Sequence, residues 1–227
     1  ILLAQLPGYT KDVLLGDPGH VTWLLGVFSA GIGVGSLLCE RMSGRVVEIG
    51  LVPFGAFGMA VFGFDLVASS GPIAENGLVR VSVDLFLLST FGGFFIVPLY
   101  ALVQSRSAPT ERSRVIAANN ILNALFVVVA SIAAAGLLAR GLTIPQLFGV
   151  AVLCHVAVAI FIFTLVPEVL MRFLVWMMIH TVYRLDIEGM DEVPDTGPAV
   201  IACNHVSFVD ALVITAACPR PIRFIMD

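Results

Sequence analysis

Charged side chains are scarce in this sequence of 227 residues. Asp, Glu, Lys and Arg make up 12% of the chain, whereas a soluble domain usually carries about 25%. Hydrophobic residues make up 59% and the mean hydropathy is +1.01, so a water-soluble globule would lack the polar surface that must face the solvent. The 12 basic residues are scattered and the net charge is −4, which argues against a nucleic-acid partner. The composition predicts a membrane protein.

Paired cysteines and a targeting leader are also missing. None of the cysteines forms a C-x-x-C pair, so we expect free thiols, with neither a metal site nor a disulfide framework. The chain opens with "ILLAQLPGYTK", which has neither Met nor the basic region of a signal peptide. We expect a fragment that begins inside a helix, whose last residues Ile1 to Leu6 are terminated by Pro7-Gly8. The four cysteines are Cys39, Cys154, Cys203 and Cys218.

Long uncharged runs dominate the rest of the sequence. Five runs each approach the ~20 residues that a helix needs to cross the hydrocarbon core of a bilayer. Buried helices of a soluble protein are the alternative, which five such runs in succession with short polar loops disfavour. The sequence predicts an α-helical membrane bundle with spans at Val21–Cys39, Ile49–Ser70, Leu85–Val103, Val115–Ala139 and Gly141–Val166.

Arginines alternate between the two sides of these spans. The loop after the first span carries Arg41 and Arg45, and the loop after the third carries three arginines. Only Arg80 lies in the loop between the second and third spans. The positive-inside rule places the arginine-rich loops in the cytoplasm. We therefore expect residues 10–20 outside and everything after Pro167 in the cytoplasm, which agrees with five crossings.

The composition changes after Pro167. The segment from Glu168 to Tyr183 has an apolar face, but its uncharged core is too short to span, so we expect a helix along the membrane surface. Turn residues and short apolar runs follow, and their order of strand, strand, helix and strand predicts the truncated start of an α/β domain. The predicted strands are 183–188, 199–203 and 222–226, and the predicted helix is 207–218.

One polar cluster, Asn204-His205-x-Ser207-x-x-Asp210, lies between two of these apolar runs. On one continuous helix, His205 and Asp210 would lie ~140° apart, because each residue turns the helix by ~100°. They can pair only if a helix begins between them, with Ser207 as its N-cap and Asp210 three residues later. The cluster is then either a capping box beside a turn histidine or a His–carboxylate dyad for general base catalysis. No G-x-S-x-G surrounds Ser207, which disfavours a serine hydrolase.

The stretch "YRLDIEGMDEVPDTGPAVIACNHVSFVDALVI" resembles the opening of the glycerolipid acyltransferases of the lysophosphatidic acid acyltransferase type, whose first motif is N-H-x-S-x-x-D. The resemblance implies that His205 is the general base that deprotonates a glycerol hydroxyl, and that Asp210 orients the imidazole. The hydroxyl would attack an acyl thioester carried by coenzyme A or acyl carrier protein, with no resident cofactor. The later motifs of the family are absent from this chain, so we expect the fragment alone to be inactive.

Two further stretches resemble transporters. "GVGSLLCERMSGR" resembles the loop motif of the major facilitator superfamily through Glu40, Arg41, Gly44 and Arg45, although a plain solvated loop is the alternative. "VPLYALVQSRSAPTERSRVIAANNILNALF" resembles the lysophospholipid transporters, which some bacteria fuse to an acyltransferase. The resemblance implies the C-terminal half of a major facilitator transporter at 1–167, with five full spans and a helix stub. An interfacial linker helix at 168–183 and the start of an acyltransferase domain at 184–227 would follow.

Polar side chains inside spans are candidates for transport, because hydrocarbon penalises them unless they are paired. Asn119, Asn120 and Asn123 could line a cytoplasmic vestibule or satisfy one another near the interface. His155 could couple protons or form a hydrogen bond between helices. Asp65 is expected to reach water at the outer end of its span.

Small residues recur every four positions in the first span, at Gly26-x-x-x-Ala30 and Gly31-x-x-x-Gly35. Such spacing lets two helix backbones approach closely. The contact could be a seam that moves during transport or a static one.

Together these features predict a bifunctional protein of the bacterial inner membrane. It would move lysophospholipid to the cytoplasmic side and re-acylate it there, with membrane lipid and an acyl carrier as partners. A transporter with a degenerate or regulatory tail and a membrane-tethered acyltransferase without transport are the alternatives.

Overall fold

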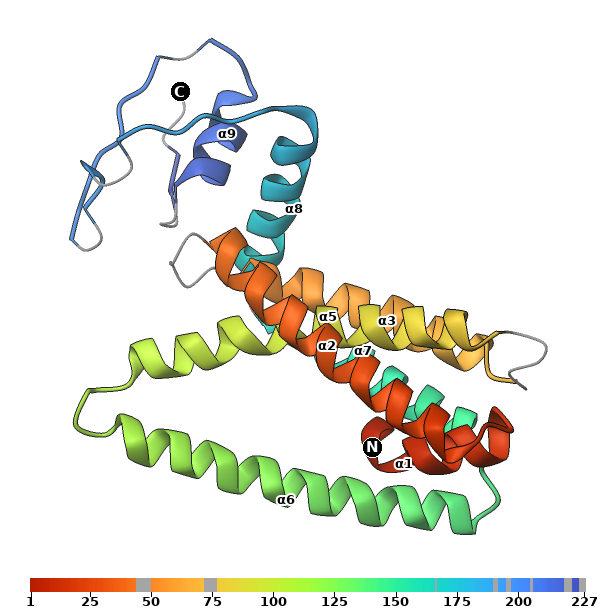
Figure 1. Ribbon diagram of the computed structural model, residues 1–227. Helices are drawn as coiled ribbons and strands as arrows, with labels where there is room; N and C mark the ends of the chain where they lie inside the picture. Colours follow the sequence, from red (N-terminus) through yellow and green to blue (C-terminus); the bar gives the residue numbers. More distant parts are fainter. Residues whose placement is uncertain are drawn as a thin grey trace. The chain divides into compact units, whose positions relative to one another are not determined.

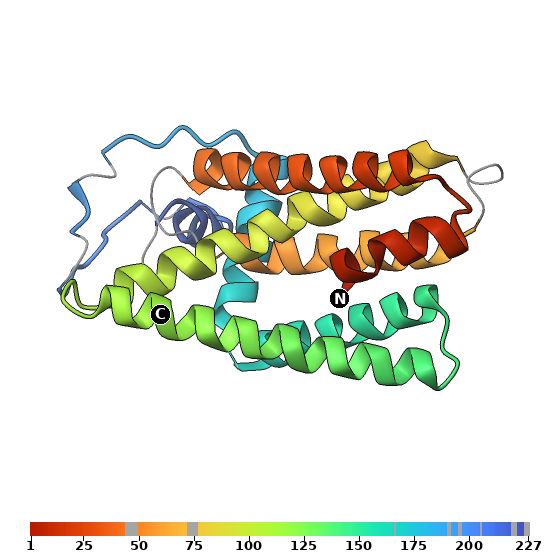
Figure 2. The same ribbon diagram turned by 60° about the horizontal axis from the view of Figure 1, so that its bottom comes forward.

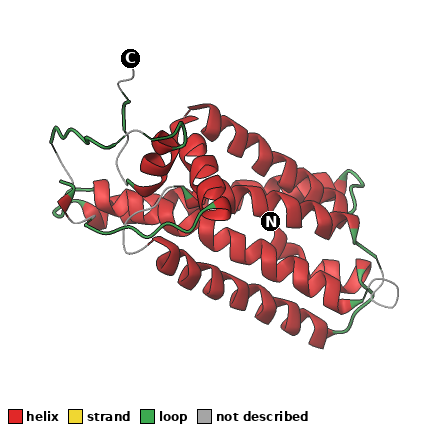
Figure 3. Cartoon of the chain, turned by 90° about the horizontal axis from the view of Figure 1, so that it is seen from above, coloured by secondary structure: helices red, strands yellow, loops and turns green. Residues whose placement is uncertain are grey.

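The computed structural model describes residues 1–43, 50–71, 77–165, 167–189, 192–194, 197–204, 206–218 and 222–224. These residues form helices and loops, with no strand among them (Figure 3). The chain divides into two compact units, Ile1–Thr164 and Leu165–Asp227.

The first unit contains five long helices (Figure 1). Each is long and apolar enough to cross a membrane, which confirms the prediction of five span-capable helices and fits a multi-pass membrane protein. They are α2 (Pro18–Ser43), α3 (Leu51–Ala68), α5 (Leu78–Arg106), α6 (Arg112–Ala139) and α7 (Ile144–Leu165).

Helix α5 is the centre of this unit, because both α2 and α3 pack along it. A Cβ added at Gly35 of α2 would lie 2.1 Å from the Thr90 carbonyl oxygen of α5, and one at Gly55 of α3 would lie 2.5 Å from the Phe95 nitrogen. The Gly31/Gly35 pair thus forms the close backbone contact that its spacing predicted. The Gly26/Ala30 pair does not, because Gly26 is exposed and a Cβ there would meet nothing within 4 Å.

Helix α6 is packed far less than its neighbours. Ala134 is its one buried residue, while Phe126, Val127 and Ile132 are between 65% and 68% exposed. Figure 2 shows α6 as a long rod that follows the loop after α5. Such an apolar surface suits contact with lipid.

The helices do not start where the uncharged runs predicted, and for two of them polar contacts explain the difference. Helix α5 begins at Leu78, seven residues before Leu85, because its first turns hold Arg80 and Asp84 in polar contacts within the protein. Helix α7 begins at Ile144 instead of Gly141. Thr143 and Gln146 form a capping box there, in which the Thr143 N–H donates to Gln146 Oε1 at 2.9 Å and the Gln146 N–H donates to Thr143 Oγ1 at 3.4 Å.

The prediction that Pro7-Gly8 ends the first helix holds only in part, because the α-helix ends at Gly8 but the chain stays helical. Helix α1 (Leu2–Gly8) contains Pro7 and continues directly into the π-helix η1 (Tyr9–Val13). The wider turn is closed by the Leu14 N–H, which donates to the Tyr9 carbonyl at 3.0 Å. Burial of Leu6, Tyr9 and Leu14 in the core of this unit outweighs the local preference of proline.

The second unit consists of α8 (Pro167–Val182), α9 (Asp210–Ala217) and irregular backbone between and after them. Helix α9 packs against α8, whose Ile179 is fully buried. The described residues of the segments predicted as strands are loops. A strand needs a neighbour for its N–H and C=O groups, and the apolar side chains of the second segment are uncovered, with Val200 96% exposed.

Candidate functional site

The turn that leads into α9 is built around the carboxylate of Asp210. Its Oδ2 atom accepts hydrogen bonds from the Val206 N–H at 2.6 Å and from the Ser207 N–H at 2.8 Å. Both donors precede the helix, so one side-chain oxygen draws the incoming backbone toward the first helical turn. Two N–H groups and one acceptor oxygen form the charge-assisted pattern expected of a carboxylate at a helix N-terminus.

Ser207 does not occupy the predicted N-cap position. Helix α9 begins at Asp210, with Val209 as its N-cap. Ser207 Oγ accepts a long hydrogen bond from the Val209 N–H at 3.4 Å, and the Ser207 carbonyl accepts one from the Asp210 N–H at 3.0 Å. Only the carboxylate half of the capping box is formed, because the turn at 207–210 uses the Ser207 carbonyl in place of its hydroxyl.

His205 lies outside the described residues. Its neighbours are described: Asn204 is exposed, Val206 is 87% exposed and Phe208 is 95% exposed. The two hydrogen bonds of Asp210 fix the backbone that directly follows position 205. Asp210 thus holds the local backbone of the motif in place. The same hydrogen bonds would form if the turn served only to start the helix.

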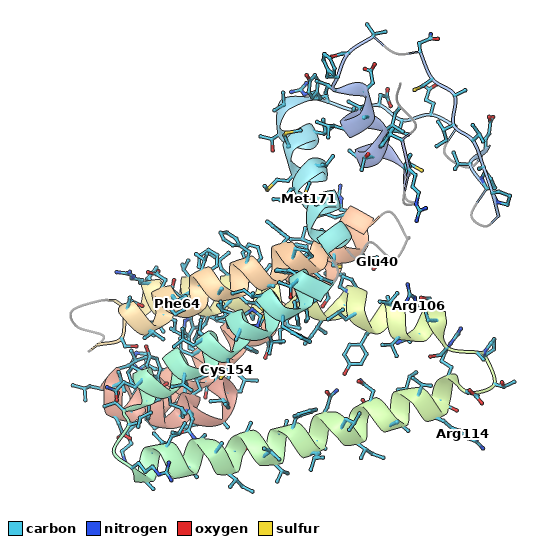
Figure 4. The ribbon with its side chains drawn as sticks, turned by 180° about the vertical axis from the view of Figure 1, so that it is seen from behind. Glu40, Phe64, Arg106, Arg114, Cys154 and Met171 are labelled. Carbon is cyan, nitrogen blue, oxygen red and sulfur yellow. The ribbon has the colours of Figure 1, made fainter. Side chains whose placement is uncertain are left out.

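The three asparagines proposed for transport lie on α6. Asn123 Nδ2 donates to the Tyr100 hydroxyl of α5 at 2.8 Å, whereas Asn119 is half-buried and Asn120 is exposed. The hairpin that joins these helices has Arg106 at the end of α5 and Arg114 near the start of α6 (Figure 4). Both asparagine interpretations stay open, since a link between α5 and α6 serves either one.

His155 links three helices of the first unit. Its Nε2 atom lies 3.1 Å from the Ala56 carbonyl oxygen of α3, and its ring meets Phe95 of α5 edge to face, with 5.7 Å between the ring centroids. This contact is the hydrogen bond between helices that was one of the two interpretations of His155.

The predicted loop motif is only partly described. Glu40 and Arg41 lie in the last turn of α2 and are exposed, so they are helical and not part of a loop (Figure 4). Gly44 and Arg45 lie outside the described residues.

Sequence reasoning missed a polar cluster where α3 ends and α5 begins. Asp84 is 2% exposed and its Oδ2 accepts a hydrogen bond from Ser69 Oγ at 3.1 Å. The Asp65 side chain is 41% exposed and is also paired, because Arg80 donates to its Oδ1 at 2.8 Å. Beside them, the buried Tyr9 bonds its hydroxyl to Ser70 Oγ at 3.0 Å. The spacing of Arg80 and Asp84, four residues apart on one helix, was the available sequence indication.

Comparison with known protein families finds a match in the last part of the chain. Residues 184–227, about a fifth of the chain, match the family described as Acyltransferase. The matched residues contain the N-H-x-S-x-x-D cluster and α9. Neither the curated proteins nor the solved structures include a match to this chain.

Proposed function

We propose that the protein is a membrane enzyme that transfers an acyl group to a lysophospholipid, joined in one chain to a transporter for that lipid. The observation that carries the proposal is the Acyltransferase match at 184–227, which follows five span-capable helices. We retain an α/β acyltransferase fold for 184–227 as part of this proposal.

In the proposed reaction, His205 takes the proton of a glycerol hydroxyl as the oxygen attacks the carbonyl carbon of an acyl thioester. The tetrahedral intermediate collapses with cleavage of the C–S bond, and the thiol leaves with the proton that His205 held. An ester forms and a thioester breaks, so the step needs no oxidant or metal. The acyl carrier is coenzyme A or acyl carrier protein.

Asp210 supports this chemistry as a positioning residue. Its bonds to the Val206 and Ser207 N–H groups hold the turn that follows position 205. A carboxylate near the imidazole would also orient the ring and stabilise its cation. Asn204 and Ser207 complete the motif, and the long 3.4 Å contact of Ser207 Oγ argues for a supporting role.

The membrane helices would deliver the lipid substrate. In this proposal lysophospholipid crosses the bacterial inner membrane to the cytoplasmic leaflet, with Asn119, Asn120, Asn123 and His155 as candidate transport residues. Helix α8 would lie at the membrane surface, because Met171, Leu174 and Met178 are apolar and at least 42% exposed. The lipid acceptor would then reach the enzyme without leaving the bilayer.

A tethered acyltransferase without transport is the second candidate. It is favoured by the backbone-close contacts that α2 and α3 make with α5. Such contacts suit a static membrane anchor.

Proteoliposomes that contain the full-length protein test both functions separately. Labelled lysolipid is followed for translocation and for acylation, in the wild type and in His205→Ala. We expect acylation to fall by a factor of about 10² to 10⁴, the usual contribution of a general base, with translocation unchanged. Intact acylation in His205→Ala would disprove the assignment of the base, and acylation without translocation in the wild type would favour the tethered enzyme.

A further inference from the structure

The hairpin between α5 and α6 concentrates positive charge. Residues 106–114 contain Arg106, Arg112 and Arg114 and one acid, Glu111, so three positive charges against one negative charge give +2 in a chain whose net charge is −4. All four side chains are exposed, and Figure 4 shows Arg106 and Arg114 on the two arms of the hairpin. Among the described residues, no ion pair includes any of the three arginines. Their guanidinium groups are therefore available to a ligand.

An apolar stripe on α6 continues directly from Arg114. Ile121 and Leu125 follow it after seven and eleven residues, a spacing that returns to the same face of a helix, and they are 70% and 56% exposed. From Arg114 to Leu125 the helix rises by about 17 Å at ~1.5 Å per residue. One leaflet contributes about 15 Å to the hydrocarbon layer. Charge at one end and a leaflet's depth of apolar surface below it match the two parts of a phospholipid.

The charge of the hairpin selects the kind of headgroup. Guanidinium groups bind phosphate oxygens through paired N–H donors. A zwitterionic headgroup carries an ammonium beside its phosphate, which a net charge of +2 repels, whereas an anionic headgroup carries no such cation. The positive-inside rule assigns this hairpin to the cytoplasmic surface, where anionic lipids attract basic segments.

We propose that the α5–α6 hairpin and the stripe from Arg114 to Leu125 bind a phospholipid with an anionic headgroup from the surrounding bilayer. The headgroup phosphate contacts the arginines and one acyl chain lies along α6. This site extends beyond the proposed function, because its ligand is a lipid of the bilayer and not the lysophospholipid that would be transported and acylated.

The opposite end of α6 supplies a matched control. Arg140 is exposed and follows the last residue of the same helix as its C-cap. It is the one basic residue between 115 and 145. Arg140→Gln therefore removes a positive charge from α6 without changing the hairpin.

The test uses the full-length protein in nanodiscs with Ile121→Trp as its single tryptophan, the others being replaced by phenylalanine. Position 121 lies about 10 Å along α6 from Arg114, at the depth of the middle of an acyl chain. Phosphatidylglycerol or phosphatidylcholine, brominated at mid-chain, is titrated against the other lipid without bromine. Quenching of the tryptophan by each brominated lipid gives their relative affinity at this face.

We expect phosphatidylglycerol to bind at least about fivefold more tightly, since one basic residue at an anionic surface contributes about this factor. The preference should disappear when Arg106, Arg112 and Arg114 are all replaced by glutamine, and Arg140→Gln should retain it. Raising the salt concentration should weaken the preference, because ions screen exposed charges, while quenching by phosphatidylcholine persists.

Equal affinity for the two lipids in the protein that retains its arginines would overturn the proposal. So would a preference that survives the triple substitution or high salt. Absence of quenching by either lipid would mean that another segment or a second copy of the chain covers α6, which also contradicts the site. The salt titration requires no arginine substitution, so the proposal stays open to disproof if the triple variant does not fold.

Discussion

At the scale of single residues, Asp210 could hold the turn into α9, supply a negative charge to the histidine, or do both. Its geometry allows these two roles to be tested separately. The hydrogen bonds that it accepts from the Val206 and Ser207 N–H groups end on one oxygen, Oδ2. An asparagine has a carbonyl oxygen that can accept both bonds, but it has no negative charge. The turn and the charge can therefore be removed independently.

We predict that Asp210→Asn preserves the turn into α9 and lowers acylation by at least about 100-fold, because the histidine would lose its anionic partner. Asp210→Ala should lose both the turn and the activity. Acylation rates and the amide resonances of Val206 and Ser207 in the full-length protein measure the two effects. Full activity in Asp210→Asn would show that the aspartate serves only the turn.

The sequence contained the motif at this scale but not its detailed geometry. Asn204, Ser207 and Asp210 could be found from spacing alone. The N-cap could not, since the competition between a serine hydroxyl and its carbonyl depends on the conformation of the turn. Asp84 was missed because its partner Ser69 lies 15 residues away, across the junction between two helices.

At the scale of elements, glycine sets how closely the helices of the first unit approach. Gly31 and Gly35 are buried against α5, whereas Gly33 of the same helix is exposed. Close packing of this kind replaces the hydrophobic effect, which does not act between helices in lipid. Gly33 and Gly35 thus lie two residues apart in different surroundings, so the same substitution can be compared at a packed and at an exposed site.

We predict that Gly35→Ala destabilises the first unit by about 1–3 kcal/mol, because the new methyl group would overlap the Thr90 carbonyl. Gly33→Ala should be neutral or stabilising by up to about 1 kcal/mol, because its Cβ meets nothing and alanine favours a helix. Thermal unfolding in detergent compares the two. Equal stability of both variants would contradict a tight α2–α5 contact.

The existence of the elements was easier to predict than their ends. Run length was sufficient for five helices, because hydrocarbon requires about 20 apolar residues for each crossing. The start of α5 was placed too late, since Arg80 and Asp84 find partners that the sequence does not display. The strands were predicted from short apolar or alternating runs. Such a pattern does not show whether a second strand lies beside the first to accept and donate its backbone hydrogen bonds.

At the scale of the whole molecule, the arginine distribution predicts the orientation in the membrane. Arg106, Arg112 and Arg114 lie at one hairpin, between α5 and α6. The segment that contains η1 lies at the other ends of the helices, where α3 meets α5. The positive-inside rule assigns the hairpin to the cytoplasm.

We predict opposite labelling of two single-cysteine variants made after the native cysteines are replaced by serine. Thr110→Cys lies in the hairpin and Asp12→Cys lies in η1, and both positions are exposed. In intact spheroplasts, where only the outer face of the inner membrane is accessible, a membrane-impermeant maleimide should label Asp12→Cys. It should label Thr110→Cys only after lysis. The reverse pattern would mean that the acyltransferase segment is on the outer side.

The unequal lengths of the helices have a consequence for the bilayer itself. Helices α5 and α6 have 29 and 28 residues, which at ~1.5 Å per residue is about 42–44 Å, whereas α3 has 18 residues and measures about 27 Å. The hydrocarbon layer is about 30 Å thick. The hydrocarbon layer should therefore be thinner around α3. Helices α5 and α6 should tilt or extend into the headgroup region. Membrane thickness, set by acyl-chain length, thus becomes a variable to which this protein should respond.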